Sequence, residues 1–81
     1  MTRRARAERT ERILIGRLEE LSRALESSGA PPEAIARLLE SASVATMNAI
    51  ALNLITIDVA ETIWRETETR HPEVASLRRA A

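Results

Sequence analysis

The chain contains no cysteine and no lysine, and Trp64 is its only aromatic residue. Without cysteine it forms no disulfide, no zinc–thiolate site and no thiol nucleophile. A single aromatic ring and two glycines argue against a β-sandwich or barrel, which needs many turns and large strand side chains. Because lysine is absent, all 12 basic residues are arginine, which we interpret as a bias of genomic composition.

The sequence also lacks the pattern of a signal peptide and of a membrane span. The N-terminus is basic, but the charged segment 7–12 follows it where a signal peptide would have an apolar region. The one long apolar run, residues 44–60, is shorter than the ~20 residues of a spanning helix, and it contains two asparagines and an aspartate. We therefore expect a cytoplasmic protein and keep a membrane-associated subunit as an alternative.

What is present is helical composition. Alanine, leucine, glutamate and arginine dominate the 81 residues, and the 12 acidic residues balance the 12 basic ones. Glutamate stands four positions before arginine five times, an orientation that stabilises a helix by ~0.2–0.5 kcal/mol per pair. The pairs are Glu8–Arg12, Glu19–Arg23, Glu33–Arg37, Glu61–Arg65 and Glu66–Arg70. Their spread predicts an all-α chain.

The helices are predicted to form one antiparallel hairpin. Leucines at positions 14, 18, 21 and 25 make one stripe, which indicates a packed first helix. Gly29 is expected to end it with a positive φ angle, and Pro31 and Pro32 suit the first turn of the next helix. We divide the single domain into an Arg-rich arm or helix start (1–12), helix 1 (13–28), a turn (29–32), helix 2 (33–70) and a C-terminal tail (71–81).

The second helix is the most informative element. No glycine or proline interrupts the sequence before Pro72, so we predict one helix from near Pro32 to about Arg70, roughly 58 Å long. Its run 44–60 is apolar nearly all round, and helix 1 covers one side of it at most. We predict that two or more hairpins pack into a helical bundle through helix 2. The expected interface residues are Ile50, Leu52, Leu54, Ile55, Ile57, Val59 and Trp64.

Three polar residues interrupt this apolar run. Asp58 is predicted to be a buried carboxylate that pairs with an arginine of the N-terminal arm or of a second chain. A buried acid that serves a ligand is its alternative role. Asn48 and Asn53 are expected to fix helix register and oligomeric state, as asparagine does in an apolar seam, although they could instead bind a ligand.

The chain offers little chemistry for catalysis. Glu68 and His71 have the Glu-x-x-His spacing of di-iron bundles, but the pattern occurs once and no acid lies in the helix 1 stripe to complete a site. We expect a non-enzymatic protein without metal or cofactor. Arg3, Arg4 and Arg6 could contact phosphates, but two nearby glutamates dilute the charge and no aromatic residue is present for base stacking.

We therefore interpret the chain as a homo-oligomerising structural or scaffolding subunit of a larger protein assembly. Its partners would be copies of itself and another protein. The alternative is an adaptor, chaperone-like or regulatory protein that binds a different partner through its apolar helix. A nucleic-acid-binding regulator that uses the N-terminal arginines is a third hypothesis.

Overall fold

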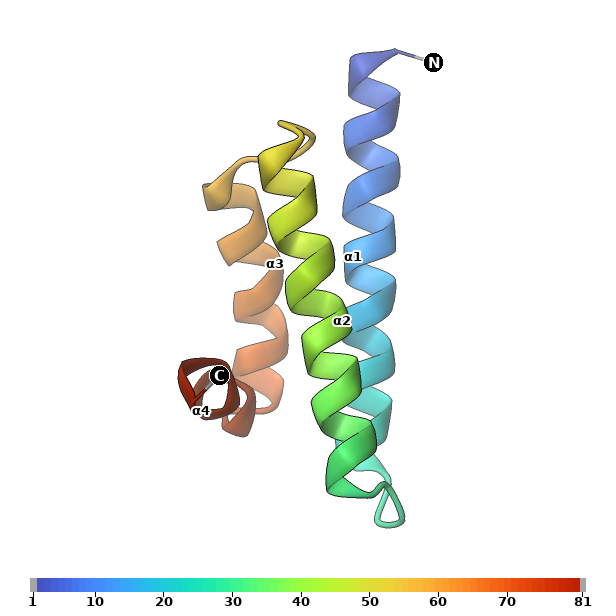
Figure 1. The fold of residues 1–81 in the computed structure, drawn as a ribbon, viewed down its shortest axis with the longest axis vertical. Coiled ribbons are helices and arrows are strands. Elements are labelled where there is room, and N and C mark those ends of the chain that lie inside the picture. Colours follow the sequence, from blue (N-terminus) through green and yellow to red (C-terminus); the bar gives the residue numbers. More distant parts are fainter. Residues whose placement is uncertain (1, 81) are drawn as a thin grey trace.

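The computed structural model describes residues 2–80, and these residues are helical with no strand among them. Figure 1 shows α1 and α2 side by side and running in opposite directions, with α4 near the lower end. Helix α3 is drawn to the left of α2 in this view and also packs against α1. The four helices are α1 (Arg3–Glu26), α2 (Pro32–Ala51), α3 (Ile57–Arg70) and α4 (Glu73–Ala80).

Helix α1 begins at Arg3, so residues 3–12 of the expected arm or helix start form the first turns of one long helix. The hydroxyl of Thr2 accepts a hydrogen bond from the Ala5 N–H at 3.0 Å, which satisfies one of the free N–H groups of the first turn. The leucine stripe faces inward as predicted: Leu14, Leu18 and Leu21 are buried. The helix therefore begins well before Leu14, the first residue of the buried stripe.

The turn between α1 and α2 spans residues 27–31, and the prediction for Gly29 is wrong. No glycine in the described chain has a positive φ angle, so Gly29 is not a left-handed cap. Helix α1 instead ends with Ser27 in an extended conformation, and the Ser27 Oγ accepts from the Gly29 N–H at 3.4 Å. Pro32 opens α2 as expected, with Glu33 in the first turn.

The predicted continuous helix over residues 33–70 is also wrong, because α2 ends at Ala51. Asn53 has a φ angle of 57° and is the one non-glycine residue with positive φ in the described chain. The N–H of Leu54 donates to the Ala49 carbonyl at 2.9 Å, and the N–H of Asn53 donates to the Ile50 carbonyl at 3.0 Å. These two bonds are the Schellman motif, with asparagine in the position that glycine usually occupies.

A new helix starts immediately after this stop. The Thr56 hydroxyl accepts from the Val59 N–H at 3.2 Å and caps α3, and Asp58 follows in the first turn, where the helix dipole favours an acid. The loop folds α3 back toward α1, so the molecule is only 41 Å along its longest axis. The fold-back supplies from the same chain part of the cover that a long helix would have needed from another copy.

The core lies where α1, α2 and α3 meet. Its buried members are Leu14, Leu18, Leu21, Leu39, Ala42, Ala49, Ile55, Ala60, Trp64 and Val74. Buried alanines on α2 and α3 belong to the same core cluster as Trp64, which is 1% exposed. The single aromatic side chain of the protein is therefore its largest core residue.

The C-terminal segment folds as the short helix α4. Helix α3 ends at Arg70, and His71 precedes Pro72, whose ring disfavours a helical residue before it. Val74 is buried against the core, whereas Leu77 is 38% exposed. Residue 81 of the predicted tail lies outside the described residues.

Candidate interaction surface

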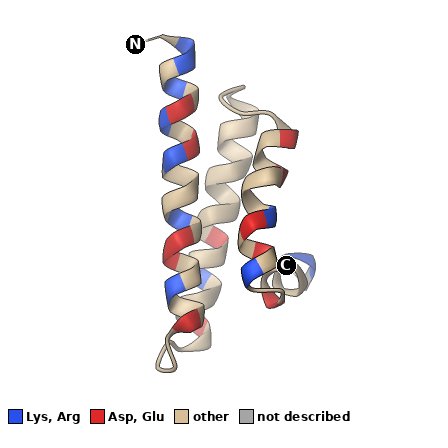
Figure 2. Cartoon of the chain, turned by 180° about the vertical axis from the view of Figure 1, so that it is seen from behind, with Lys and Arg blue, Asp and Glu red and all other residues tan. Residues whose placement is uncertain are grey.

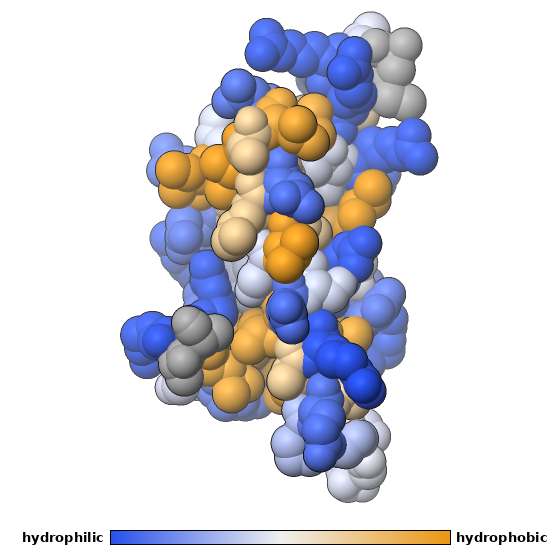
Figure 3. All heavy atoms as spheres, viewed as in Figure 1, coloured by the Kyte–Doolittle hydropathy of each residue, from blue (hydrophilic) through white to orange (hydrophobic). Residues whose placement is uncertain are grey.

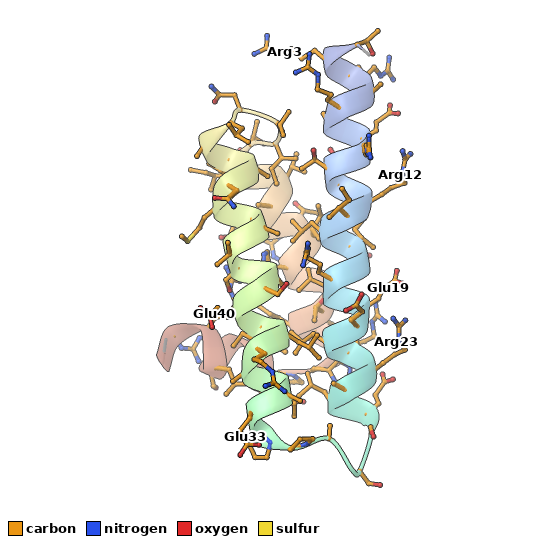
Figure 4. The ribbon with its side chains drawn as sticks, turned by 45° about the vertical axis from the view of Figure 1, so that its right-hand side comes forward. Arg3, Arg12, Glu19, Arg23, Glu33 and Glu40 are labelled. Carbon is orange, nitrogen blue, oxygen red and sulfur yellow. The ribbon has the colours of Figure 1, made fainter. Side chains whose placement is uncertain are left out.

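The charged residues are distributed very unevenly between α1 and α2. Half of the 24 residues of α1 are charged, and Figure 2 shows them along its whole length. In Figure 4, Arg12, Glu19 and Arg23 point away from α2 into solvent. In contrast, no charged residue occurs from Ser41 to Ile57. The second half of α2 and the loop after it thus form a segment without charge beside the charged first turns of α1.

This uncharged segment exposes large apolar side chains. Val44 is 45% exposed, Met47 65%, Leu52 69% and Ile57 63%. Val44 and Met47 lie on the outer side of α2, opposite Ala42 and Ala49, which face the core. Single exposed hydrophobic residues are normal, whereas four of them in one stretch of sequence without charge make that stretch a candidate interaction site. We call these four residues the apolar face.

A groove of about 900 Å³ adjoins the apolar face between α2 and α4. It exists because α2 packs on α1 while α4 packs on α3, which leaves the space between α2 and α4 open. Figure 3 shows hydrophobic atoms gathered both near the α2–α3 loop and lower down, between α2 and α4. The main apolar residues of the groove are Leu25, Ile35, Leu39, Met47, Trp64 and Leu77. Met47 therefore belongs to the apolar face and also stands at the edge of the groove.

Trp64 lies at the base of the groove. Its Nε1–H donates to the Thr46 Oγ1 at 2.9 Å, and the Thr46 hydroxyl donates to the Ala42 carbonyl at 2.8 Å. Trp64 thereby has its polar atom satisfied although it is fully buried. The base of the groove is thus a buried aromatic ring whose polar atom is satisfied.

Arg78 connects α4 to this base. Its guanidinium carbon lies 4.1 Å from the centroid of the Trp64 ring, close enough for a cation–π contact. The Arg78 Nη1 donates to the Glu68 Oε2 at 3.1 Å, and Nη2 lies 3.9 Å from the Glu61 Oε1. Because Arg78 is already paired with these acids, the groove offers little free positive charge to an anionic ligand.

His71 is largely buried at the end of α3. Its side chain is 12% exposed and lies between two carboxylates, with Nε2 3.2 Å from the Glu26 Oε1 and Nδ1 3.6 Å from the Glu73 Oε1. The approach to Glu26 is not aligned as a hydrogen bond. Glu68, the other member of the Glu-x-x-His pattern, pairs with Arg78. Among residues 2–80, no group of three or more potential metal-ligating residues comes together.

The predicted interface residues do not share one surface. Leu52 and Ile57 are exposed, whereas Ile50, Leu54 and Val59 are half-buried. Ile55 is 6% exposed and Trp64 is 1% exposed, so neither is accessible to a partner. The fold-back of α3 buries these two side chains within the chain itself, which corrects the prediction for both.

The predicted polar residues also lie elsewhere than expected. Asp58 is exposed, and in the described part of the chain it forms no ion pair, so the predicted buried pair with the arm is wrong. Asn48 and Asn53 are exposed rather than placed in a buried seam of the chain. Asn53 has a local role instead, because its left-handed backbone ends α2.

The arginines in the first turns of α1 are exposed, but glutamates stand among them. Arg3, Arg4 and Arg6 are exposed, and Figure 4 shows Arg3 at the far end of α1. The Arg4 Nε lies 3.4 Å from the Glu8 Oε1, an exposed ion pair of little energetic weight.

Sequence reasoning missed Val44 and Met47 as interface candidates. Both occur in the apolar run, but the expected interface started further along the chain. The three-residue spacing from Val44 to Met47 places them on one side of α2, a pattern that becomes meaningful once Ala42 and Ala49 are known to face α1 and α3.

Comparison of the chain with protein-family models, curated proteins and solved structures finds no match. No helix in residues 2–80 combines the length and the hydrophobicity that crossing a bilayer requires.

Proposed function

We propose that this protein is a non-enzymatic structural subunit that associates with copies of itself through the outer side of α2. The observation that carries the proposal is the apolar face, four large hydrophobic side chains between 45% and 69% exposed in a segment without charge. Their exposure to water is unfavourable at roughly 25 cal/mol per Å² of apolar area, which association would recover.

The arrangement of the helices supports a bundle as the assembled form. Helix α1 already covers the inner side of α2, so two copies that meet through α2 would place α1, α2 and their two counterparts in one layer of four helices. The charged residues of α1, which Figure 2 shows along the whole helix, would remain on the outside of such a layer.

The zero formal charge of the chain favours the same proposal. Copies with no net charge do not repel one another at long range, so short-range apolar contact decides whether they associate. An adaptor that binds a helix of another protein is the second candidate, and the open groove beside the apolar face favours it.

The mass of the purified protein in solution tests this proposal. We expect light scattering at micromolar concentrations to give a multiple of 9.0 kDa. Val44→Asp should reduce the mass to that of one chain, because burying its unpaired charge in an interface is costly. Thr69→Asp, on an exposed position of α3, is the matched control and should leave the assembly intact. A folded wild-type monomer at all concentrations would refute self-association.

A further inference from the structure

Two side chains, Val74 and Arg78, attach helix α4 to the core. Val74 is fully buried, and the Arg78 guanidinium carbon lies 4.1 Å from the centroid of the Trp64 ring. Leu77, the other large apolar residue of α4, is 38% exposed at the wall of the groove. From this attachment we infer that α4 is a hinged cover for the Trp64 ring, which Arg78 holds closed and which opens while α1, α2 and α3 stay folded.

The junction between α3 and α4 has the features of a hinge. His71 has a φ angle of −133° and a ψ angle of 82°, outside the helical region, and Pro72 follows it. The His71 N–H donates to the Thr67 carbonyl at 2.8 Å, so the last backbone hydrogen bond of α3 is made before Pro72. Rotation of the backbone at residues 71–72 therefore moves α4 and leaves the hydrogen bonds of α3 in place.

Helix α4 depends on docking for its order. It has eight residues, fewer than an isolated helix needs to be stable in water. Figure 1 shows it at the lower end of α3, which is the element that it mainly packs on. A short terminal segment with one fully buried side chain opens at a lower free energy than the whole protein. Undocking of α4 and loss of its helix are therefore one local event.

Arg78 is the polar part of the attachment. Its Nη1 donates to the Glu68 Oε2 at 3.1 Å, and its Nη2 lies 3.9 Å from the Glu61 Oε1, so it joins α4 to two successive turns of α3. The Arg78 side chain is 28% exposed, and water competes with both carboxylates for the guanidinium. The contact is thus specific in geometry and readily broken.

Opening of α4 uncovers the indole without releasing it. The Trp64 Nε1–H donates to Thr46 of α2, a hydrogen bond in which α4 takes no part. When Arg78 leaves, the ring face beneath it becomes part of the groove, and the wall formed by Leu77 is removed. The closed form hides the ring and narrows the groove. Helix α4 therefore limits access to this site, a role that does not rest on the proposed self-association through the outer side of α2.

Fluorescence quenching tests the role of Arg78, because Trp64 is the only tryptophan of the chain. Arg78→Gln removes the charge and the guanidinium stack. We expect it to raise the acrylamide quenching constant of Trp64 roughly twofold or more. The matched control is Arg79→Gln, at an exposed neighbouring position that forms no ion pair within residues 2–80, and it should quench like the wild type.

Hydrogen exchange measured by NMR tests whether α4 opens alone. In the wild-type protein we expect the amides of residues 75–79 to have protection factors roughly tenfold or more below those of the buried leucines of α1. Arg78→Gln should lower the protection of α4 further and leave that of Leu18 and Leu21 unchanged. Arg79→Gln should change neither.

Three results would overturn the inference. Equal protection of α4 and of Leu18 and Leu21 in the wild type would mean that α4 opens only with the whole fold. Equal quenching in Arg78→Gln and Arg79→Gln would mean that Arg78 does not hold the cover closed. Loss of the helical circular dichroism of the entire chain in Arg78→Gln would mean that α1, α2 and α3 need α4 in order to stay folded.

Discussion

The indole Nε1–H of Trp64 donates to the Thr46 Oγ1 at 2.9 Å, a hydrogen bond that joins α3 to α2. The Thr46 hydroxyl in turn donates to the Ala42 carbonyl, one turn earlier in α2. Helices α2 and α3 have few other close backbone approaches, since α1 is the main neighbour of both. This buried polar pair therefore specifies how α3 docks and keeps the indole at the base of the groove.

Removing the acceptor of this bond should destabilise the fold. Thr46→Val keeps the shape of the side chain but leaves the Trp64 N–H buried without a partner, which typically costs about 1–3 kcal/mol. Denaturant unfolding followed by Trp64 fluorescence measures the loss. Thr46→Ser retains the hydroxyl and should lose less stability than Thr46→Val. Equal losses in the two variants would show that methyl packing, and not the hydrogen bond, matters at this position.

The end of α2 should depend on the backbone of Asn53. Because its φ angle is 57°, a β-branched residue is strained there, and Asn53→Val should lower the free energy of unfolding by about 1–2 kcal/mol. Asn53→Gly meets no such strain and should be close to neutral. Thermal unfolding of the two variants provides the comparison. If Val were tolerated as well as Gly, the break between α2 and α3 would have another cause.

The start of α3 should depend on Thr56. Thr56→Ala removes the hydroxyl that accepts from the Val59 N–H, a loss of about 1 kcal/mol for a typical helix cap. Thr69→Ala is the control, since the Thr69 hydroxyl donates to the Arg65 carbonyl within α3 and caps nothing. Chemical denaturation of both proteins should show a loss only for Thr56→Ala. If Thr56→Ala and Thr69→Ala were equally stable, the Thr56 cap would not be what determines the start of α3.

Gly29 should accept a side chain without loss. Its φ angle is not positive, and a Cβ atom added to it would meet nothing within 4 Å. Gly29→Ala should stabilise the protein by about 0.4–1 kcal/mol, because it restricts the unfolded chain more than the folded one. The midpoint of urea unfolding is the measurement. A decrease in the midpoint would mean that this turn needs the freedom of glycine.

Local patterns in the sequence predicted the first half of the fold well. The leucine stripe of α1 is buried, and the two prolines mark the start of α2 within a turn that lies close to the predicted one. These features depend on spacing and on the fixed φ angle of proline, which act over a few residues. The break after α2 was missed because its stop residue is Asn53 rather than glycine, and because Thr56 was interpreted as part of an apolar helix.

The amino-acid sequence by itself determined that the chain is helical, that α1 carries the charge and that residues 41–57 carry none. Helix propensity and charge pattern are properties of residues that are close in sequence, so both can be recognised from the sequence alone. Only the tertiary structure decided which apolar residues stay exposed. The reversal at residues 52–56 buries Ile55 and Trp64 and leaves Val44 and Met47 outside, because the direction in which α3 returns selects the side of α2 that it covers.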